Sequence, residues 1–431
     1  MITTSTNIES IKTTSYKVVI PFYAYAGVSF LVACIFLLTS AAGFTQHYFT
    51  PHLLAITHTM ALGWATMIIL GASHQLVPVL IEGKLYSDKL AYASFVLAAI
   101  GIPLLVYGFY TFNMGHPAKW GGRFVVFAIL SFLINIAKSI SGSKKENIHG
   151  IFIFTSILWL FLTVLLGLAL VYNFTYTNLM PFDSLHYLPL HAHTGIIGWF
   201  LLLVIGVGSR LIPMFLISKY TNNNVLWVIF LLINAALVFY TLSFYTFDIK
   251  ELTFIPITLI LLAVVLFIFY CIKAYKQRLR KQVDDQVKIS LLSVFMLLLP
   301  IIMLVIIISI LLSLPVENAT LAIVYGFLIF FGWLTAIILG MTFKTLPFIV
   351  WNKVYHHRSS MGKTPNPKDL FSDTIFKIMS VSYLVGFSLF ACGILFSSIP
   401  TLIVGASGLI ITAVLYNWNV LKVLFHKPVI K

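Results

Sequence analysis

The stretch HTMALGWATMIILGASHQLVP, from His58 to Pro78, recurs twice more in the chain without a gap. The second copy is HTGIIGWFLLLVIGVGSRLIP at 193–213, and the third is FLIFFGWLTAIILGMTFKTLP at 327–347. In each copy a Gly-Trp pair is followed by a glycine seven residues after the tryptophan and a proline fourteen residues after it. Close backbone packing explains why glycine is common in membrane helices, but it does not explain a shared register. The three copies therefore indicate an internal repeat.

The composition places this repeat in a membrane protein. Of the 431 residues, 60% are hydrophobic and 9% are charged, whereas soluble globular proteins carry roughly 25% charged residues. Apolar runs long enough to span a bilayer as a helix recur from Val18 to Phe425. A soluble enzyme is therefore excluded, and the polar start lacks the cleavage site of a removable signal peptide. The three cysteines form no CxxC or CxxCH motif, so no disulfide framework, thiolate metal site or c-type heme attachment is expected.

We predict an all-α polytopic membrane protein with twelve transmembrane helices. The repeat copies fall in the second, sixth and tenth spans, so we expect three four-helix units related by pseudo-threefold symmetry. One membrane domain covers 18–425, between tails at 1–17 and 426–431. The predicted spans are 18–44, 52–80, 90–112, 122–141, 149–173, 186–216, 224–247, 252–275, 288–314, 319–350, 372–398 and 400–425.

The distribution of basic residues predicts the orientation. A formal net charge of +15 could indicate a nucleic-acid partner. If both tails are cytoplasmic, however, all of the 27 Lys and Arg residues except Lys119, Arg123 and Lys250 lie on the cytoplasmic side. This is the positive-inside pattern of a multi-pass protein of the inner (cytoplasmic) membrane. We expect anionic inner-leaflet lipid, and no nucleic acid, as the partner of this charge.

Histidines are concentrated on the outer side, where lysine and arginine are scarce. Six residues before the motif tryptophan, the first two copies carry His58 and His193. Eight residues before it, the second copy carries His191 and the third carries Tyr325. Because His191 and His193 diverge by about 200° around a helix, they would serve two neighbouring sites. Ionisable side chains at membrane depth indicate a functional site.

Neutral imidazoles are ligands of heme iron and of copper. We expect His58 and His193, on facing helices, to hold a low-spin heme b. His191 would bind a second centre, either a high-spin heme or a copper ion held together with His186 or His52 from the outer side. Hydrogen bonding between helices, or a proton or ion path, are the alternative roles of these histidines.

Two further repeat positions carry polar groups. Tyr325 is either a hydrogen-bonding or redox-active phenol, and then a candidate catalytic residue, or an ordinary packed aromatic. Eleven residues after the tryptophan, the copies carry Gln75, Arg210 and Lys344. The two cations either extend toward lipid headgroups or, if the three helices converge, form one anion or headgroup pocket.

Twelve spans, a histidine early in the second, and HAHTGIIGW at 191–199 followed by Gly206 and Pro213 resemble the heme-copper oxidase superfamily, catalytic subunit I. The likeness is greatest to the cbb-type oxidases and the related nitric oxide reductases. The resemblance implies hemes in pores between three four-helix arcs, with His58 and His193 on the low-spin heme and His191 on the high-spin heme. The family carries its HxH motif on the tenth helix and its copper-binding histidines on the sixth and seventh, whereas the seventh span here has no histidine.

The resemblance thus implies an integral membrane protein that binds one or two hemes b, with copper as a further candidate cofactor. It would act in respiratory electron transfer or in reduction of oxygen or nitric oxide, with a quinol or cytochrome as donor and with further membrane subunits as candidate partners. The alternative is a non-catalytic heme- or copper-binding protein for nitric oxide response or for metal or heme handling. The missing seventh-span histidines favour this alternative. A transporter built on repeats is disfavoured by the lack of intramembrane charge.

Overall fold

The computed structural model describes residues 14–143, 147–176, 179–246, 250–314, 318–355 and 364–428. Most of the predicted tail 1–17, and the last residues of the tail 426–431, lie outside these ranges. Within them every regular element is a helix, and twelve helical spans are long and apolar enough to cross a membrane. The prediction of an all-α, multi-pass membrane protein is therefore confirmed.

Eight spans are single helices and four are composite. The single helices are α1 (Tyr16–Thr39), α4 (Asp88–Tyr110), α5 (His116–Ser141), α6 (Ile148–Asn173), α9 (Asn223–Thr246), α10 (Phe254–Lys276), α15 (Asp373–Leu395) and α16 (Ile399–Leu424). The composite spans are α2 (Pro51–His58) with η2 (Thr59–Thr66) and α3 (Met67–Leu80); α7 (Ser184–His193) with η3 (Thr194–Leu201) and α8 (Leu202–Leu216); α11 (Asp285–Met296) with α12 (Leu298–Ser313); and α13 (Ala319–Phe327) with η5 (Leu328–Leu334) and α14 (Thr335–Tyr355). Short 3-10 turns are η1 (Ala41–Thr45), η4 (Lys250–Thr253) and η6 (Pro367–Leu370).

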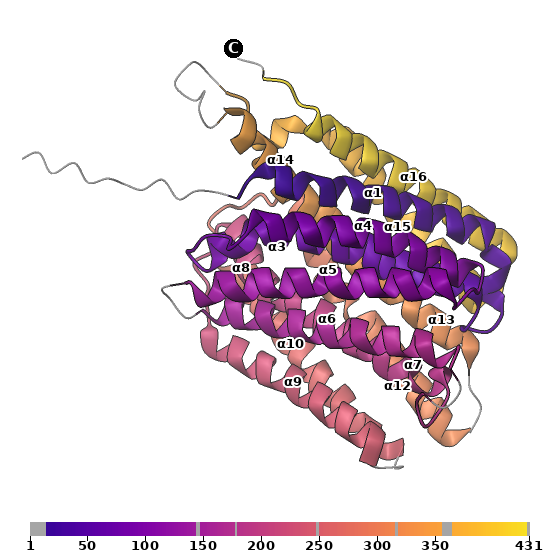
Figure 1. The fold of residues 1–431 in the computed structure, drawn as a ribbon. Coiled ribbons are helices and arrows are strands. Elements are labelled where there is room, and N and C mark those ends of the chain that lie inside the picture. Colours follow the sequence, from indigo (N-terminus) through magenta and orange to yellow (C-terminus); the bar gives the residue numbers. More distant parts are fainter. Residues whose placement is uncertain are drawn as a thin grey trace, which may run out of the picture.

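The first span is shorter than predicted, and the tenth is longer. The expected range 18–44 ends as a helix at Thr39, because the chain turns at Ser40 into the separate turn η1. The tenth span continues five residues beyond the predicted end at 350, to Tyr355. The spans lie side by side, and the start of α1 and the end of α16 lie at the same end of the bundle (Figure 1). We call this end, which also carries Lys84, Lys344 and Lys368, the basic end.

The internal repeat has a structural counterpart that was not predicted. Each repeat span changes from α- to π-helical geometry at its Gly-Trp motif, in η2, η3 and η5. A π turn inserts one extra residue per turn and is found frequently at functional sites. The glycine seven residues after each tryptophan lies against the span that precedes its own. A Cβ atom added at this glycine would contact the side chain of Phe22 for Gly71, of Phe152 for Gly206 and of Ser290 for Gly340. The grouping of all twelve spans into three units stays a prediction.

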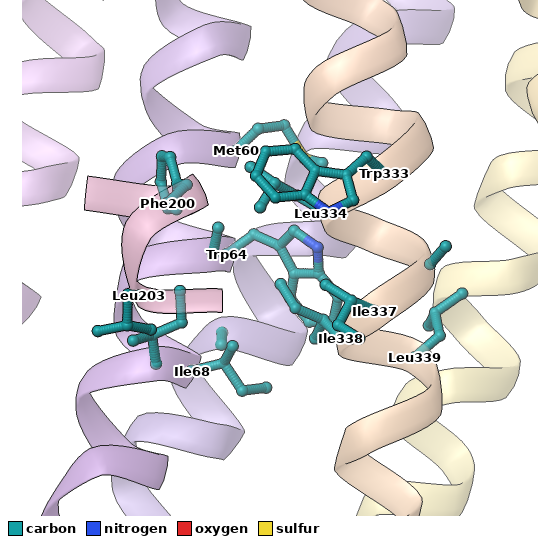
Figure 2. Packing of buried hydrophobic residues seen from close by; sticks show 14 of the residues in the cluster. Met60, Trp64, Ile68, Phe200, Leu203, Trp333, Leu334, Ile337, Ile338 and Leu339 are labelled. Atoms are coloured by element: carbon teal, nitrogen blue, oxygen red, sulfur yellow. The ribbon is translucent and has the colours of Figure 1, made fainter. Parts of the chain in front are cut away.

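The motif tryptophans pack at the centre of the bundle and are bonded from copy to copy. Figure 2 shows Trp64 and Trp333 close together among the buried side chains of the repeat helices. The indole N–H of Trp199 donates to Thr66 Oγ1 at 3.0 Å, and that of Trp64 donates to Thr335 Oγ1 at 3.2 Å. Both threonines stand two residues after the tryptophan of their own copy. The bonds therefore run from the second copy to the first, and from the first to the third.

The third bond of this cycle is missing. By the same rule Trp333 would donate to the residue two after Trp199, but that residue is Leu201, which has no hydroxyl. Trp333 is buried, and its Nε1 atom has no hydrogen-bond partner among the described residues. An unpaired buried donor costs free energy, so the cycle contains one unfavourable position.

Two buried asparagines fasten helix starts elsewhere in the bundle. Asn135 of α5 accepts from the backbone N–H of Ser87 and donates to the backbone carbonyl of the same residue, both at 2.9 Å. Asn419 of α16 makes the same pair of bonds with Ser372. The two serines are the N-cap residues of α4 and α15, so each asparagine fixes the start of the helix that it packs against.

Candidate functional site

A cavity of about 330 Å³ lies between the three repeat spans, toward the end of the bundle opposite the basic end. The first copy contributes His58, the second contributes His191, and the third contributes Tyr325 and Gly326. Most other wall residues are leucine, isoleucine, valine or phenylalanine. A volume in this range with apolar walls and few polar groups is typical of cofactor and small-ligand sites.

His58 and His191 both line this cavity and lie close to each other. Their ring centres lie 6.3 Å apart and their planes differ by 15°. The Nδ1 atom of His58 lies 2.8 Å from the carbonyl oxygen of Leu54, and Nδ1 of His191 lies 3.1 Å from that of Thr163. Because a carbonyl oxygen only accepts, each Nδ1 carries the proton and each Nε2 keeps its lone pair. Histidines that bind metals are commonly held in this way.

His193 belongs to a second cavity, of about 170 Å³. Its Nδ1 lies 2.7 Å from the carbonyl oxygen of Pro189, and its Nε2 lies 3.2 Å from the Tyr325 hydroxyl, which therefore donates. Tyr325 lines both cavities. His191 and His193 therefore line two different cavities, and the prediction that they serve two neighbouring sites stays a prediction.

The structure brings His58 to His191 and not, as expected, to His193. His58 and His193 hold the same position in their copies. If the three repeat helices are arranged in a cycle, equivalent side chains point in the same direction around that cycle and therefore do not meet each other. Instead, the residue six positions before the tryptophan of one copy lies near the residue eight positions before the tryptophan of the next copy. This rule pairs His58 with His191, and His193 with Tyr325, whose ring centres lie 6.3 and 5.9 Å apart. By the same rule the third pair would be Phe327 and Ile56, which are both apolar and both line the first cavity.

The copper set expected around His191 is not assembled. No three His, Cys, Asp or Glu side chains come together as a metal site within the described ranges. His52 is exposed and its ring packs against Tyr110, with ring centres 4.7 Å apart. His186 is also exposed and packs against Phe182, with ring centres 4.4 Å apart. Both side chains are thus taken up by aromatic neighbours at the surface.

Two glycines shape the first cavity, and sequence reasoning missed both. A Cβ atom on Gly167 would lie 2.7 Å from Cε1 of His191, so only glycine lets this ring pack against α6. A Cβ atom on Gly326 would meet no atom within 4 Å, so this residue borders open space. One sequence signal could have identified Gly326. It lies directly after Tyr325 and directly before Phe327, the residue of the third copy that is equivalent to His58 and His193.

The polar residues eleven positions after the tryptophans do not form one pocket. Lys344 lies 2.5 Å from Asp284 Oδ2 and lines a separate cavity at the basic end, which neither Gln75 nor Arg210 lines. Arg210 is exposed. The expectation of a shared anion pocket on the pseudo-threefold axis is therefore wrong for these three residues.

No model of a known protein family matches the chain, and no significant match to a curated protein is found. The fold and the cavities define a multi-pass α-helical membrane protein with an apolar, ligand-sized cavity that presents two imidazoles.

Proposed function

We propose that the protein binds one heme b in the first cavity, where His58 and His191 would hold its iron. The observation that carries the proposal is the pair of nearly parallel imidazoles, 6.3 Å apart between ring centres, with both Nδ1 atoms held by carbonyls. With each Nδ1 proton donated to a carbonyl, the Nε2 lone pairs of both rings would be free to bind the iron of such a group. Such a group would supply one-electron redox chemistry.

The donor set favours a heme over a metal ion held by side chains alone. A porphyrin occupies four coordination positions of its iron, so two histidines complete the site. A bare metal ion takes three or more protein ligands, and the described residues offer no such group. Apolar and aromatic walls with the open space beside Gly326 suit a flat hydrophobic macrocycle.

The His193–Tyr325 pair favours one heme rather than two. The lone pair of His193 Nε2 already accepts from the tyrosine, so His193 is less available as a ligand than His191. Tyr325 borders the heme cavity, and we propose that its phenol is the group able to hydrogen-bond a small molecule there. The reduction of oxygen or nitric oxide, or electron transfer to a partner, would take place at the heme cavity beside Tyr325.

We further propose that the basic end faces the cytoplasm, with both chain ends on that side of an inner membrane. The support is the clustering of lysine and arginine at this end of the bundle. The second candidate function, non-catalytic heme handling or nitric oxide sensing, is favoured by the lack of a three-ligand metal group in the described part of the chain.

Heme content tests the proposal without removing a ligand. Gly326→Leu fills the open space beside the cavity, whereas Gly326→Ala adds one methyl group and is the matched control. Protein purified from cells supplied with heme is expected to carry about one heme per chain, and G326L is expected to lose most of it while G326A keeps it. Full heme content in G326L, or none in the parent, would overturn the proposed site.

Turnover separates the enzyme from the binding protein. A heme-loaded sample given a short-chain quinol and either oxygen or nitric oxide is expected to consume the gas if the protein is a reductase. If heme is bound and no gas is consumed, with either this quinol or a reduced cytochrome c as donor, the non-catalytic function is supported.

A further inference from the structure

A polar cavity of about 640 Å³ lies at the basic end, far from the histidine cavities along the repeat spans. It is open to one side and is bordered by the loop after α10, the starts of α11 and α15, the middle of α14 and the turn η6. Its wall carries twice as many cations as carboxylates. They are Arg280, Lys281, Lys288, Lys344, Lys368 and Lys377, against Asp284, Asp285 and Asp373.

Two of the three carboxylates, Asp284 and Asp285, are already paired within the wall. Asp284 lies 2.5 Å from Lys344 Nζ and 3.2 Å from an Arg280 nitrogen. Partial burial acts to raise the pKa of the Asp284 carboxyl, but the hydrogen bond and charge of Lys344 outweigh it and lower that pKa. Asp284 is therefore ionised at neutral pH and fully engaged. Asp285 in turn lies 2.7 Å from Lys288 Nζ.

Lys281 and Lys368 are the cations that remain. Neither makes an ion pair with any carboxylate in the described ranges, and both line the cavity. Both side chains are exposed, and an anion bound between them would be attracted by both positive charges. The two lysines are carried by separate elements, the loop before α11 and the turn η6, and they border the same cavity.

The start of α11 adds a second attraction for negative charge. Its N-cap residue Asp284 makes no side-chain capping bond, because the carboxylate is turned toward Lys344. The first turn, with Asp285 and Gln286, borders the cavity. Helix starts attract anions through their free backbone N–H groups and the helix dipole. Basic pockets between transmembrane helices are known as binding sites for phosphate headgroups.

We infer that this cavity binds a phosphate-bearing anion, held chiefly by Lys281 and Lys368. The phosphate could belong to the headgroup of an anionic lipid or to a small soluble phosphate, and the chemistry of recognition is the same for both. The inference is independent of the heme proposal, because the two cavities share no residue.

Binding can be measured on the full-length detergent-solubilised protein by native mass spectrometry, with phosphatidylglycerol and inorganic phosphate as separate probes and phosphatidylcholine as the neutral reference. The test variant is Lys281→Gln/Lys368→Gln, which leaves the Lys344–Asp284 pair intact. The matched control is Lys84→Gln/Lys89→Gln, which removes two lysines at the same end outside the cavity wall.

The test variant is expected to weaken binding of at least one phosphate probe about thirtyfold, roughly fivefold per lysine, while the control changes it less than threefold. A loss seen for phosphatidylglycerol alone identifies a lipid site, and a loss seen for inorganic phosphate identifies a soluble ligand. Equal affinities in the test and control variants for both probes, or no binding of either probe to the parent, would overturn the inference. Thermal unfolding of all variants checks that they are folded.

Discussion

Replacing Leu201 by threonine should complete the cycle of tryptophan–threonine bonds. The indole N–H of Trp333 has no partner in the described structure, and Leu201 stands where the other two copies carry the accepting threonine. Thr335 shows the geometry that the new residue would take, since its hydroxyl accepts from Trp64 and donates to the carbonyl of Phe330 at 2.7 Å. The substitution should therefore satisfy the buried donor.

The expected gain is about 1 kcal/mol. Leaving a buried donor unpaired costs roughly 1–3 kcal/mol, and hydrogen bonds between membrane helices average about 0.6 kcal/mol with a maximum near 2. Leu201→Val is the control, because valine and threonine have the same shape and both lose packing relative to leucine. Unfolding in mixed micelles of detergent and sodium dodecyl sulfate, followed by circular dichroism, should show L201T more stable than L201V by about this amount.

A second background isolates the bond itself. In Trp333→Phe the orphan donor is gone, so the advantage of L201T over L201V should vanish or change sign. The reasoning is refuted if L201T is no more stable than L201V in the parent, or if its advantage is unchanged in W333F.

Three further predictions concern a close glycine contact, a helix start and an ion pair. Gly340→Ala should destabilise by about 1–3 kcal/mol, because its Cβ would lie 2.6 Å from the carbonyl oxygen of Gln286, whereas Gly326→Ala should be neutral or stabilising by up to about 1 kcal/mol; equal effects in the same unfolding assay would contradict the close approach. Asn135→Leu should cost about 2 kcal/mol, since two backbone groups of Ser87 lose their partner, and an unfolding midpoint like that of the parent would argue against this role. Asp284→Asn should lower the melting temperature at pH 7. Because the pKa of Asp284 is lower in the folded protein than the unfolded value of 3.8, its contribution to stability is present above pH 3.8 and is lost as the pH falls through the folded pKa. The melting temperatures of parent and variant should therefore converge at that low pH. A gap that stayed constant down to low pH would contradict the ion pair.

Hydropathy was sufficient to predict that the twelve spans exist, since a membrane helix can be recognised from the length and composition of an apolar run. The repeat also indicated that the side chains of His191 and His193 diverge, since they lie two residues apart on one helix, and the two histidines line different cavities. The ends of the spans were less predictable. The turn at Ser40 depends on local backbone geometry that an apolar run does not reveal.

The pairing of His58 with His191 could not be read from one helix at a time. Helical periodicity gives the direction of a side chain relative to its own axis, but not which neighbour it meets. The repeat contained the missing rule, since a cyclic arrangement joins unlike positions of successive copies, as the Trp199–Thr66 bond also does. The π-helical segments coincide with the repeated Gly-Trp pair, but the pair does not by itself specify π-helical geometry, and the open space beside Gly326 depends on tertiary packing.

The proposed heme ligands are tested most directly by the optical spectrum of the reduced protein purified with heme supplied. We predict a low-spin b-type alpha band that is lost in His58→Ala and in His191→Ala but retained in His193→Ala. The absence of such a band in the parent would contradict heme binding. A band lost in H193A and retained in H191A would contradict the pairing of His58 with His191.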